Sequence, residues 1–456
     1  MIKISAVVLL FLFFNTCTVH AQKGLSETFK HYLDLTNSFL IDGGKWIRQN
    51  KDKIPGDTNA ASYYALEFYR GINANTVQLK LKNYIPLSSQ WKNIGELVLS
   101  WNAEKRKAVL YGVGADGVII TGESQWIAAN ELRLVLSSTN AEGKSEVSKE
   151  VFRFKDGKIE VSDTTGKLST HMTFTPMEQP AGNLTFMSTR DGNFEMYSMD
   201  ATGENLKNLS CNKATDYAFS YAKDGRLAFY SNRDGNNEIY IMDSAGKKQT
   251  NITNHPSGDR VPYFSPDGKQ VLFISDRDHK SGEIYIMDAD GNNVKRLTSN
   301  EYFEDAAGWS NDGKKIYFSR ELRDLKDTSA KAPGNGEIFV MDADGSNEIR
   351  ITNRPGFDGG PTLSPDGTTI AFYGKTAEGN YDIFLMDTDG KNIINLTEDV
   401  MEDYSPAWSP DGKWIAYTKG NSKNYDVWMI HLQTRIKTRL TTQPKRDESP
   451  FWQPVK

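Results

Sequence analysis

A short apolar motif recurs along the chain at nearly constant spacing, and this repeat limits the possible folds more than any other feature. Its clearest copies run apolar, aromatic, apolar, Met, Asp, as in Ile239–Asp243 and Ile284–Asp288, and the first and last copies are weaker. The last residue of each copy falls at positions 200, 243, 288, 342, 387 and 431, in steps of 43, 45, 54, 45 and 44 residues. Six units with a period near 45 residues predict six β-propeller blades of four strands each.

Each unit divides into four strand-like segments. In one unit, residues 263–265 lead into the tight turn Pro266–Gly268, and an apolar run follows at 271–275. Residues 284–288 predict the third strand, and residues 294–298 the fourth, after a second Asp-Gly turn. Glycine accepts the positive φ that such turns require. The recurrence of both turns in most units supports the assignment of four strands to a blade.

This repeat resembles the TolB-type propeller repeat, a relative of the WD repeat, over residues 181–456. The resemblance rests on three kinds of segment: Ser-Pro-Asp-Gly turns at 265–268, 364–367 and 409–412, Ser-x-Arg-Asp-Gly loops at 188–192 and 231–235, and Met-Asp-x-Asp-Gly turns. It implies a propeller that binds an envelope protein or a peptidoglycan-associated partner. The fourth unit departs from the pattern, because residues 321–335 hold about nine extra residues, and such loops often carry specificity.

The end of the sequence predicts how the ring closes. Residues 447–452 copy residues 403–408, which begin the sixth unit, whereas the first unit starts near Leu184 without an obvious innermost strand. We therefore expect the C-terminal strand to complete the first blade, which leaves no blade edge open.

Residues 1–21 have the features of a cleaved secretory signal peptide. Lys3 precedes an apolar run at 6–14, and small residues occupy the cleavage positions of Val19-His20-Ala21. Phe14-Asn15-Thr16 is a poor match to the small apolar residues before a lipidated cysteine, so lipoprotein anchoring through Cys17 is not predicted. No later segment approaches the roughly 18 apolar residues of a spanning helix. The mature protein is therefore expected in a periplasm or outside the cell.

Residues 22–175 do not repeat and predict a separate small antiparallel β domain with an N-terminal helix. Residues 26–40 have helical apolar spacing, and several strand-like runs separated by Asp-Gly turns follow, which favours a barrel or a sandwich. Gly44-Lys45-Trp46 is similar to the Gly-x-Trp opening of lipocalin-like barrels. The abundant aromatic residues of this domain either fill a core or line a ligand cavity. TolB carries an α/β N-terminal domain, which this region does not match, so the resemblance by itself does not imply a role in the Tol–Pal complex.

Charge and cysteine content narrow the partners and the sources of stability. The formal net charge of −5 becomes −6 when Lys3 leaves with the signal, which argues against nucleic acid or anionic lipid as a partner. Without Cys17 only Cys211 remains, so an internal disulfide is impossible.

One acidic residue recurs at the same place in each unit, eight residues before the Asp of the first turn. The strand that begins there is the innermost strand of a blade, so these carboxylates are predicted to ring one mouth of the axial channel. The six acids are Asp216, Asp259, Glu304, Asp358, Asp403 and, in the C-terminal copy, Asp447. The loops of the same face carry Arg190, Arg233 and Arg277.

Six neighbouring carboxylates repel one another unless something compensates their charge. Three explanations are open and compatible: the arginines and backbone amides of the loops pair with them, a cation such as Ca²⁺ binds them, or a basic or amine-bearing partner docks over the mouth. No other cofactor is predicted, and the identity of any metal is unknown. The Asp-x-Asp-Gly strings, which look like half an EF-hand loop, are interpreted as hairpin turns.

Catalytic motifs are sparse, so binding is favoured over catalysis. Some relatives of the repeat are prolyl peptidases, but the Gly-x-Ser-x-Gly elbow of a peptidase is missing, and no Cys or His cluster has zinc spacing. His255 and His279 could serve a lyase as base or metal ligand, although nothing in the sequence pairs them. The predicted function is an envelope binding scaffold whose partner docks at the acidic mouth. The alternatives are a carbohydrate-active propeller enzyme, either a polysaccharide lyase or a glycosidase, and a small-molecule carrier that uses the N-terminal barrel.

Overall fold

The computed structural model describes ten strands and residues 143–144 between residues 45 and 176, and then residues 179–322, 335–398 and 400–455. Two compact units divide the chain between Glu178 and Gln179. The predicted signal peptide, Cys17 and the helix at 26–40 lie outside the described residues, as does most of the insertion at 321–335. All regular elements of the described residues are β-strands. Among these residues there is no helix long and apolar enough to cross a membrane.

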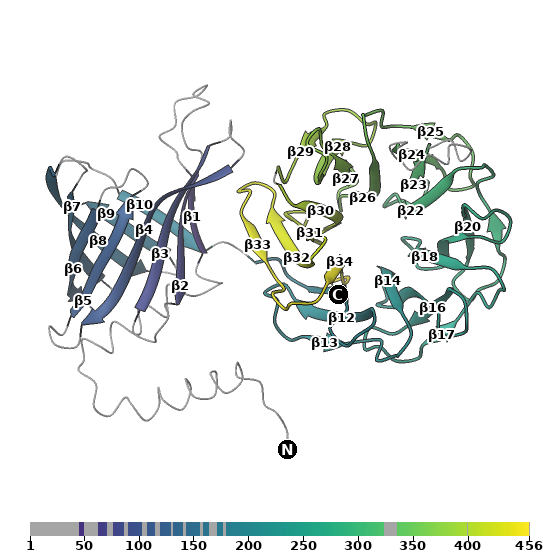
Figure 1. The fold of residues 1–456 in the computed structure, drawn as a ribbon, viewed down its shortest axis with the longest axis horizontal. Helices are drawn as coiled ribbons and strands as arrows, with labels where there is room; N and C mark the ends of the chain where they lie inside the picture. Colours follow the sequence, from purple (N-terminus) through teal and green to yellow (C-terminus); the bar gives the residue numbers. More distant parts are fainter. Residues whose placement is uncertain are drawn as a thin grey trace, which may run out of the picture. The chain divides into compact units, whose positions relative to one another are not determined.

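The first unit is a closed antiparallel barrel (Figure 1). Its strands are β1 (Lys45–Gln49), β2 (Tyr63–Arg70), β3 (Thr76–Ile85), β4 (Gln90–Asn102), β5 (Lys107–Gly114), β6 (Ile119–Ala128), β7 (Glu131–Thr139), β8 (Ser145–Lys155), β9 (Lys158–Asp163) and β10 (His171–Pro176). Each strand pairs with the next, and β1 pairs with β10, Trp46 opposite Pro176. Lipocalin barrels have eight strands, whereas ten strands are described here, so the lipocalin-like assignment stays a prediction.

The second unit is a ring of six four-stranded blades among the described residues (Figure 1). Blade 1 contains β11 (Asn183–Ser188), β12 (Glu195–Asp200), β13 (Lys207–Asn208) and β34 (Asp447–Trp452). Blade 2 contains β14 (Asp216–Tyr221), β15 (Leu227–Ser231), β16 (Glu238–Met242) and β17 (Thr250–Asn251), and blade 3 contains β18 (Asp259–Phe264), β19 (Gln270–Ser275), β20 (Glu283–Asp288) and β21 (Lys295–Arg296).

The remaining blades repeat this order. Blade 4 contains β22 (Phe303–Trp309), β23 (Lys315–Glu321), β24 (Gly336–Asp342) and β25 (Ile349–Arg350). Blade 5 contains β26 (Asp358–Leu363), β27 (Thr369–Lys375), β28 (Tyr381–Asp387) and β29 (Ile394–Asn395), and blade 6 contains β30 (Glu402–Trp408), β31 (Trp414–Asn421), β32 (Asn424–His431) and β33 (Lys437–Arg439). The predicted all-β fold with a six-bladed propeller is confirmed.

The closing strand comes from the C-terminal segment, as predicted. β34 pairs with β11, Leu184 opposite Trp452 and Ser188 opposite Asp447. Blade 1 therefore joins the two ends of the propeller sequence within one sheet.

The core lies between neighbouring blades. The second and third strands of each blade are sandwiched between the two adjacent sheets, which explains why the recurring motif is apolar along its whole length rather than alternating. In blade 3, Leu272 and Ile284 are fully buried and pack with Ile316 and Phe318 of blade 4. An aromatic side chain at one position of every second strand is fully buried: Phe186, Phe229, Phe273, Phe318, Phe372 and Tyr417.

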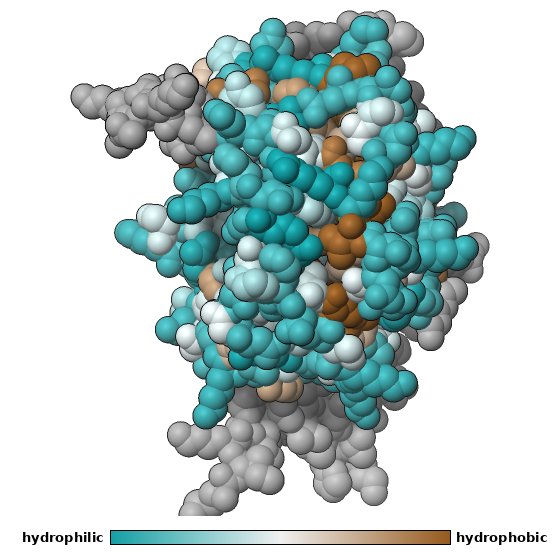
Figure 2. All heavy atoms as spheres, turned by 90° about the vertical axis from the view of Figure 1, so that its right-hand side faces the viewer, coloured by the Kyte–Doolittle hydropathy of each residue, from teal (hydrophilic) through white to brown (hydrophobic). Residues whose placement is uncertain are grey.

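The outer strands show the opposite character. They contain two or three residues each, and such short edge strands offer little backbone for pairing with another chain. The side of the molecule in Figure 2 is mostly hydrophilic and carries one narrow band of hydrophobic residues.

Every inner strand contains a β-bulge. The register of each inner strand shifts within its first few residues, for example between Arg260 and Tyr263 of β18. The residue two positions after the acid has a positive φ in four blades: Val261 (55°), Gly360 (59°), Ser405 (52°) and Ser449 (52°). The bulge gives the start of the strand its own orientation, separate from the rest of the strand.

Candidate functional site

The six predicted acids occupy equivalent positions at the starts of the inner strands. Five of them are fully buried, and Asp358 is 2% exposed. They therefore lie inside the protein at the loop face, which we define as the face with the starts of the inner strands and the loops between second and third strands.

Each of the six acids has a cationic partner, which comes from a loop in four blades and from the second strand in two. Three partners are the arginines predicted on the loops: the Arg233–Asp216 and Arg277–Asp259 distances are 2.9 Å, and the Arg190–Asp447 distance is 3.0 Å. The other three pairs are Arg320–Glu304, Arg354–Asp358 at 2.9 Å and Lys419–Asp403 at 3.3 Å. Charge pairing inside the ring therefore accounts for the compensation that these carboxylates need.

The Ser-x-Arg-Asp motif explains how three of the arginines are held. In blade 2, the Arg233 Nε donates a hydrogen bond of 2.8 Å to the Ser231 hydroxyl. Its guanidinium lies 4.7 Å from the centre of the Tyr240 ring, a favourable cation–π arrangement. The next residue, Asp234, accepts a hydrogen bond from the Tyr240 hydroxyl. Blades 1 and 3 repeat this set, so the motif fixes a cation over each buried acid.

The remaining blades reach the same pairing by a different route. Arg320 and Lys419 stand directly opposite the acid in the strand register, where the first three blades have Ser. In blade 5 that position is Gly374, and Arg354 enters from the preceding loop. A Cβ on Gly374 would lie 2.5 Å from Asp358 Oδ1 and 2.7 Å from an Arg354 nitrogen, so only glycine leaves room for the pair.

A second ring of buried acids, which the sequence reasoning missed, lies at the starts of the third strands. Its members are Glu195, Glu238, Glu283, Glu337, Asp382 and Asp426, all at most 7% exposed. Most accept a hydrogen bond from a hydroxyl near the outer strand, as Glu195 does from Ser210 at 2.7 Å and Glu337 from Thr352 at 2.7 Å. Each acid directly precedes an apolar and an aromatic residue of the recurring motif, and this position in the repeat was the signal that could have revealed it.

The two rings meet at the junctions between blades. The Thr298 hydroxyl contacts Glu283 of blade 3 and also Glu304 of blade 4. Burial raises the pKa of Asp216, Asp259 and Glu304. Burial also raises the pKa of Asp358 to about 7, with a further contribution from repulsion by Glu337. The propeller thus joins its blades with buried, paired carboxyl groups.

The same loops carry the residues from which a metal site or a histidine-based site could be built. Within the described ranges, no group of three or more His, Cys, Asp or Glu residues is placed to hold a metal ion. The Nδ1 atoms of His255 and His279 accept hydrogen bonds from the backbone amides of Ser257 at 3.1 Å and Ser281 at 3.3 Å. Each of these histidines therefore stabilises the turn of its own loop.

The accessible residues of the loop face include aromatic, positively charged and negatively charged side chains. We call Arg260, Asp276, Phe303, Tyr425 and Arg446 the loop-face rim. Arg260 pairs with Asp276 at 2.5 Å and lies 5.6 Å from the centre of the Phe303 ring. Arg446 lies 4.8 Å from the centre of the Tyr425 ring, pairs with Glu448 at 2.6 Å and keeps 46% of its side chain exposed. The rim is therefore an ordered surface around the channel mouth.

Comparison with known proteins relates the ring to one family. Residues 225–329 and 327–456 match the family model described as the TolB beta propeller domain. The structure of TolB from Acinetobacter baumannii is similar with a TM-score of 0.53 and 19% identity, over 74% of this chain and 82% of that one. The structure of a putative TolB from Agrobacterium tumefaciens has a TM-score of 0.46 and 19% identity, over 60% of this chain and 92% of that one. No curated protein matches the sequence.

Proposed function

Because the chain belongs to the TolB beta propeller domain family, we propose that it is a binding scaffold of the cell envelope. Its propeller docks a protein partner over the loop-face mouth of the axial channel. The N-terminal barrel is a second binding module in this proposal, and residues 1–21 direct export to a periplasm or to the outside of the cell.

The loop-face rim is the observation that carries this proposal. Arginine and aromatic side chains are enriched where protein partners contribute most of their binding energy. Arg446 and Phe303, which is 36% exposed, are held by ring and ion-pair contacts before any partner arrives. Side chains that are already ordered lose little conformational entropy on binding.

The six acids support docking without contacting the partner. Because they are buried and paired, they hold the starts of the inner strands in place and so fix the rim above them. A partner then meets a rim of mixed charge, with Arg260 beside Asp276 and Arg446 beside Glu448. This arrangement suits an envelope protein or peptidoglycan-associated partner of complementary mixed charge rather than a strongly basic one.

A comparison of captured partners tests the proposal. Tagged full-length protein and an Arg446→Ala/Phe303→Ala variant are used to capture proteins from envelope extract, and the bound proteins are identified by mass spectrometry. We expect the variant to lose at least one partner, and its melting temperature shows how far the loss of the Arg446–Glu448 pair lowers the stability of the fold. Lys445→Ala, an exposed neighbour of Arg446, is the control and is expected to keep every partner. Identical partner lists for all three proteins would contradict docking at the rim.

A further inference from the structure

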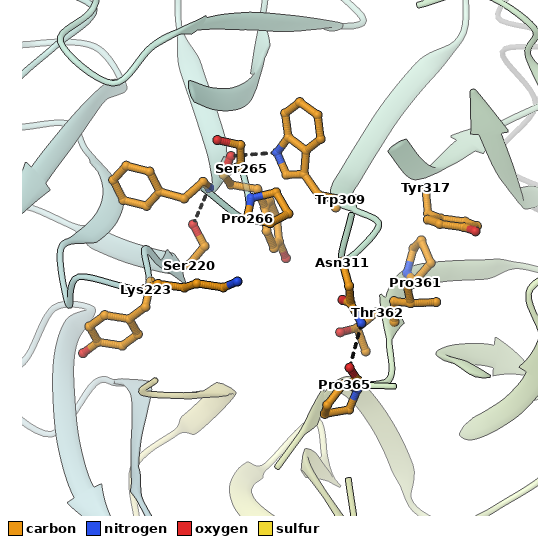
Figure 3. Close-up of a pocket in the computed structure, with 15 residues that line it drawn as sticks. Ser220, Lys223, Ser265, Pro266, Trp309, Asn311, Tyr317, Pro361, Thr362 and Pro365 are labelled. Atoms are coloured by element: carbon orange, nitrogen blue, oxygen red, sulfur yellow. Dashed lines mark hydrogen bonds between the residues drawn. The ribbon is translucent and has the colours of Figure 1, made fainter. Parts of the chain in front are cut away.

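A cavity of about 430 Å³ lies at the opposite end of the channel, where the first and second strands of the blades are joined by tight turns (Figure 3). We call this end the turn face. The lining residues come from the inner strands and first turns of blades 2 to 5, together with Tyr317 of β23. Inner strands of four successive blades meet only around the propeller axis, so the cavity lies at the axis. Its volume falls in the range of about 300–1,000 Å³ typical of ligand pockets.

The walls of this turn-face cavity combine apolar and polar surface in similar amounts and are fixed by bonds between blades. Tyr263, Trp309 and Pro361 form much of the surface, with Pro266 and Pro365 at the turns. The Trp309 indole donates a hydrogen bond to the Tyr263 carbonyl at 3.4 Å. The Asn311 amide donates to the Ser364 and Pro365 carbonyls, both at 2.9 Å, and the Ser220 hydroxyl donates to the Pro262 carbonyl at 3.1 Å. The polar groups of Trp309, Asn311 and Ser220 are therefore already engaged within the wall.

The hollow exists because one blade lacks a side chain at the inner position. Four residues after each acid, the six blades carry Ser220, Tyr263, Gly308, Thr362, Ala407 and Phe451. A Cβ on Gly308 would meet nothing closer than the Pro361 carbonyl at 3.8 Å, which is ordinary contact. Gly308 has no positive φ, so the backbone does not require glycine there. The space above Gly308 is thus a gap that another side chain could fill without strain.

The charge of the lining is positive. Lys223 is the only charged residue among those that line the cavity, and Figure 3 shows its amine directed into the hollow. Neither an ion pair nor a hydrogen bond occupies this amine among the residues that the structure describes. The neighbouring aspartates cap their own turns: Asp267 accepts from the Ser265 hydroxyl at 2.7 Å, and Asp312 accepts from the Ser310 hydroxyl at 2.7 Å.

From this geometry we propose that the turn-face cavity binds the C-terminal end of a partner polypeptide. An apolar or aromatic last side chain packs against Tyr263, Trp309 and the prolines, and the terminal carboxylate pairs with the Lys223 amine. A hollow at one end of the propeller axis receives a chain end more easily than the middle of a chain. Capture of a terminal carboxylate is a recurring mode of peptide recognition, and its hydrogen bonds to an amine are charge-assisted.

Two matched peptides test this inference on the full chain. Acetyl-Ala-Pro-Phe with a free carboxylate and the same peptide as its C-terminal amide are titrated by calorimetry. We expect the acid to bind at least tenfold more tightly than the amide, which corresponds to about 1.4 kcal/mol. Lys223→Gln should weaken the acid by a similar factor and leave the amide unchanged.

Two further variants complete the design. Gly308→Leu should abolish binding of both peptides, since its side chain fills the hollow, and its melting temperature shows whether the ring stays folded. Lys269→Gln, on an exposed neighbouring turn outside the cavity, should bind as the wild type does. Equal binding of acid and amide, or no saturable binding of either, would overturn the inference. Binding of a uronic acid disaccharide that depends on Lys223 would overturn the peptide assignment in favour of a sugar.

Discussion

At the scale of single residues, the buried acids determine how the propeller responds to pH. Asp358 has a pKa of about 7 because burial disfavours its charged form, and its Oδ2 atom has no hydrogen-bond partner in the described residues. An unfolded Asp has a pKa of about 3.9. Between these two values the folded chain holds a proton that the unfolded chain has released. The free energy of unfolding therefore falls as the pH rises through this window.

Replacing Asp358 with Asn should remove this pH dependence. The wild type is expected to lose stability between about pH 4 and pH 7 with a limiting slope of about 1.4 kcal/mol per pH unit from this group, and Asp358→Asn should flatten that slope. Urea unfolding at several pH values measures it. The pH dependence is compared rather than the absolute stability, because the substitution also changes the hydrogen bond between Arg354 and residue 358.

Asp312→Asn provides the matched control for Asp358. Hydrogen bonds from Ser310 and the Lys314 amide lower the pKa of Asp312, so its contribution is lost only as the pH falls below the unfolded value. Its removal should leave the slope between pH 5 and pH 7 unchanged. A wild-type slope in Asp358→Asn would show that another group is responsible.

Two glycines of the propeller strands should differ sharply in their tolerance of a side chain. Gly374→Ala places a Cβ against Asp358 and Arg354 and should lower stability by about 1–3 kcal/mol, as overpacking does. Gly308→Ala meets only one atom at ordinary contact distance and should change stability by less than about 0.5 kcal/mol. Thermal melts of the two variants compare them directly, and equal losses would contradict the tight packing at Gly374.

The sequence predicted the site residues where the repeat keeps its spacing. The eight-residue step located five acids, the copied C-terminal segment located Asp447, and the Ser-x-Arg-Asp loops located Arg190, Arg233 and Arg277. Arg320 and Lys419 were missed because they stand opposite the acid only in the strand register, which a one-dimensional spacing does not show. The burial of the acids was missed for a related reason: packing between blades, not position on a strand, encloses their side chains.

At the scale of strands, the apolar segments were predicted closely and the outer strands were not. In blade 3, the predicted runs at 271–275 and 284–288 correspond to β19 and β20, which extend one residue further at the start. The predicted fourth strand at 294–298 is only β21, residues Lys295–Arg296. An outer strand pairs with a neighbour on one side only and makes few packing contacts. A prediction from apolar composition therefore makes the strand too long.

The closing strand offers a direct test at this scale. Deleting residues 447–456 removes β34 and leaves β11 without its inner neighbour, so we expect the propeller to lose its cooperative melt by circular dichroism. Deleting only residues 454–456 is the control, since β34 and the bond from the Gln453 amide to the Asn183 carbonyl remain. A melt like that of the wild type after the longer deletion would contradict the role of β34.

At the scale of the whole molecule, repetition made the propeller predictable and its absence left the first unit uncertain. Agreement among six copies of one unit supports the prediction for each copy, and the same strand order runs from the inner to the outer strand of every blade. The sequence of the first unit does not repeat, so no comparison of copies supports a prediction of its fold. Gly44-Lys45-Trp46 alone could not specify a ten-stranded barrel. Function was predictable only as binding, because neither unit carries a recognised catalytic motif in the sequence.

The pairing of β11 with β34, which closes the ring, affects the order in which the blades can assemble. Arg190 and Asp447, which pair across it, are 257 residues apart in sequence. Bringing such distant segments together costs on the order of 5 kcal/mol of chain entropy, unless the intervening chain has already folded. Contacts of this range slow folding. We therefore expect the intervening blades to form first and to hold the two strands near each other, so that the last step of folding is the docking of β34 onto β11 rather than the growth of another blade.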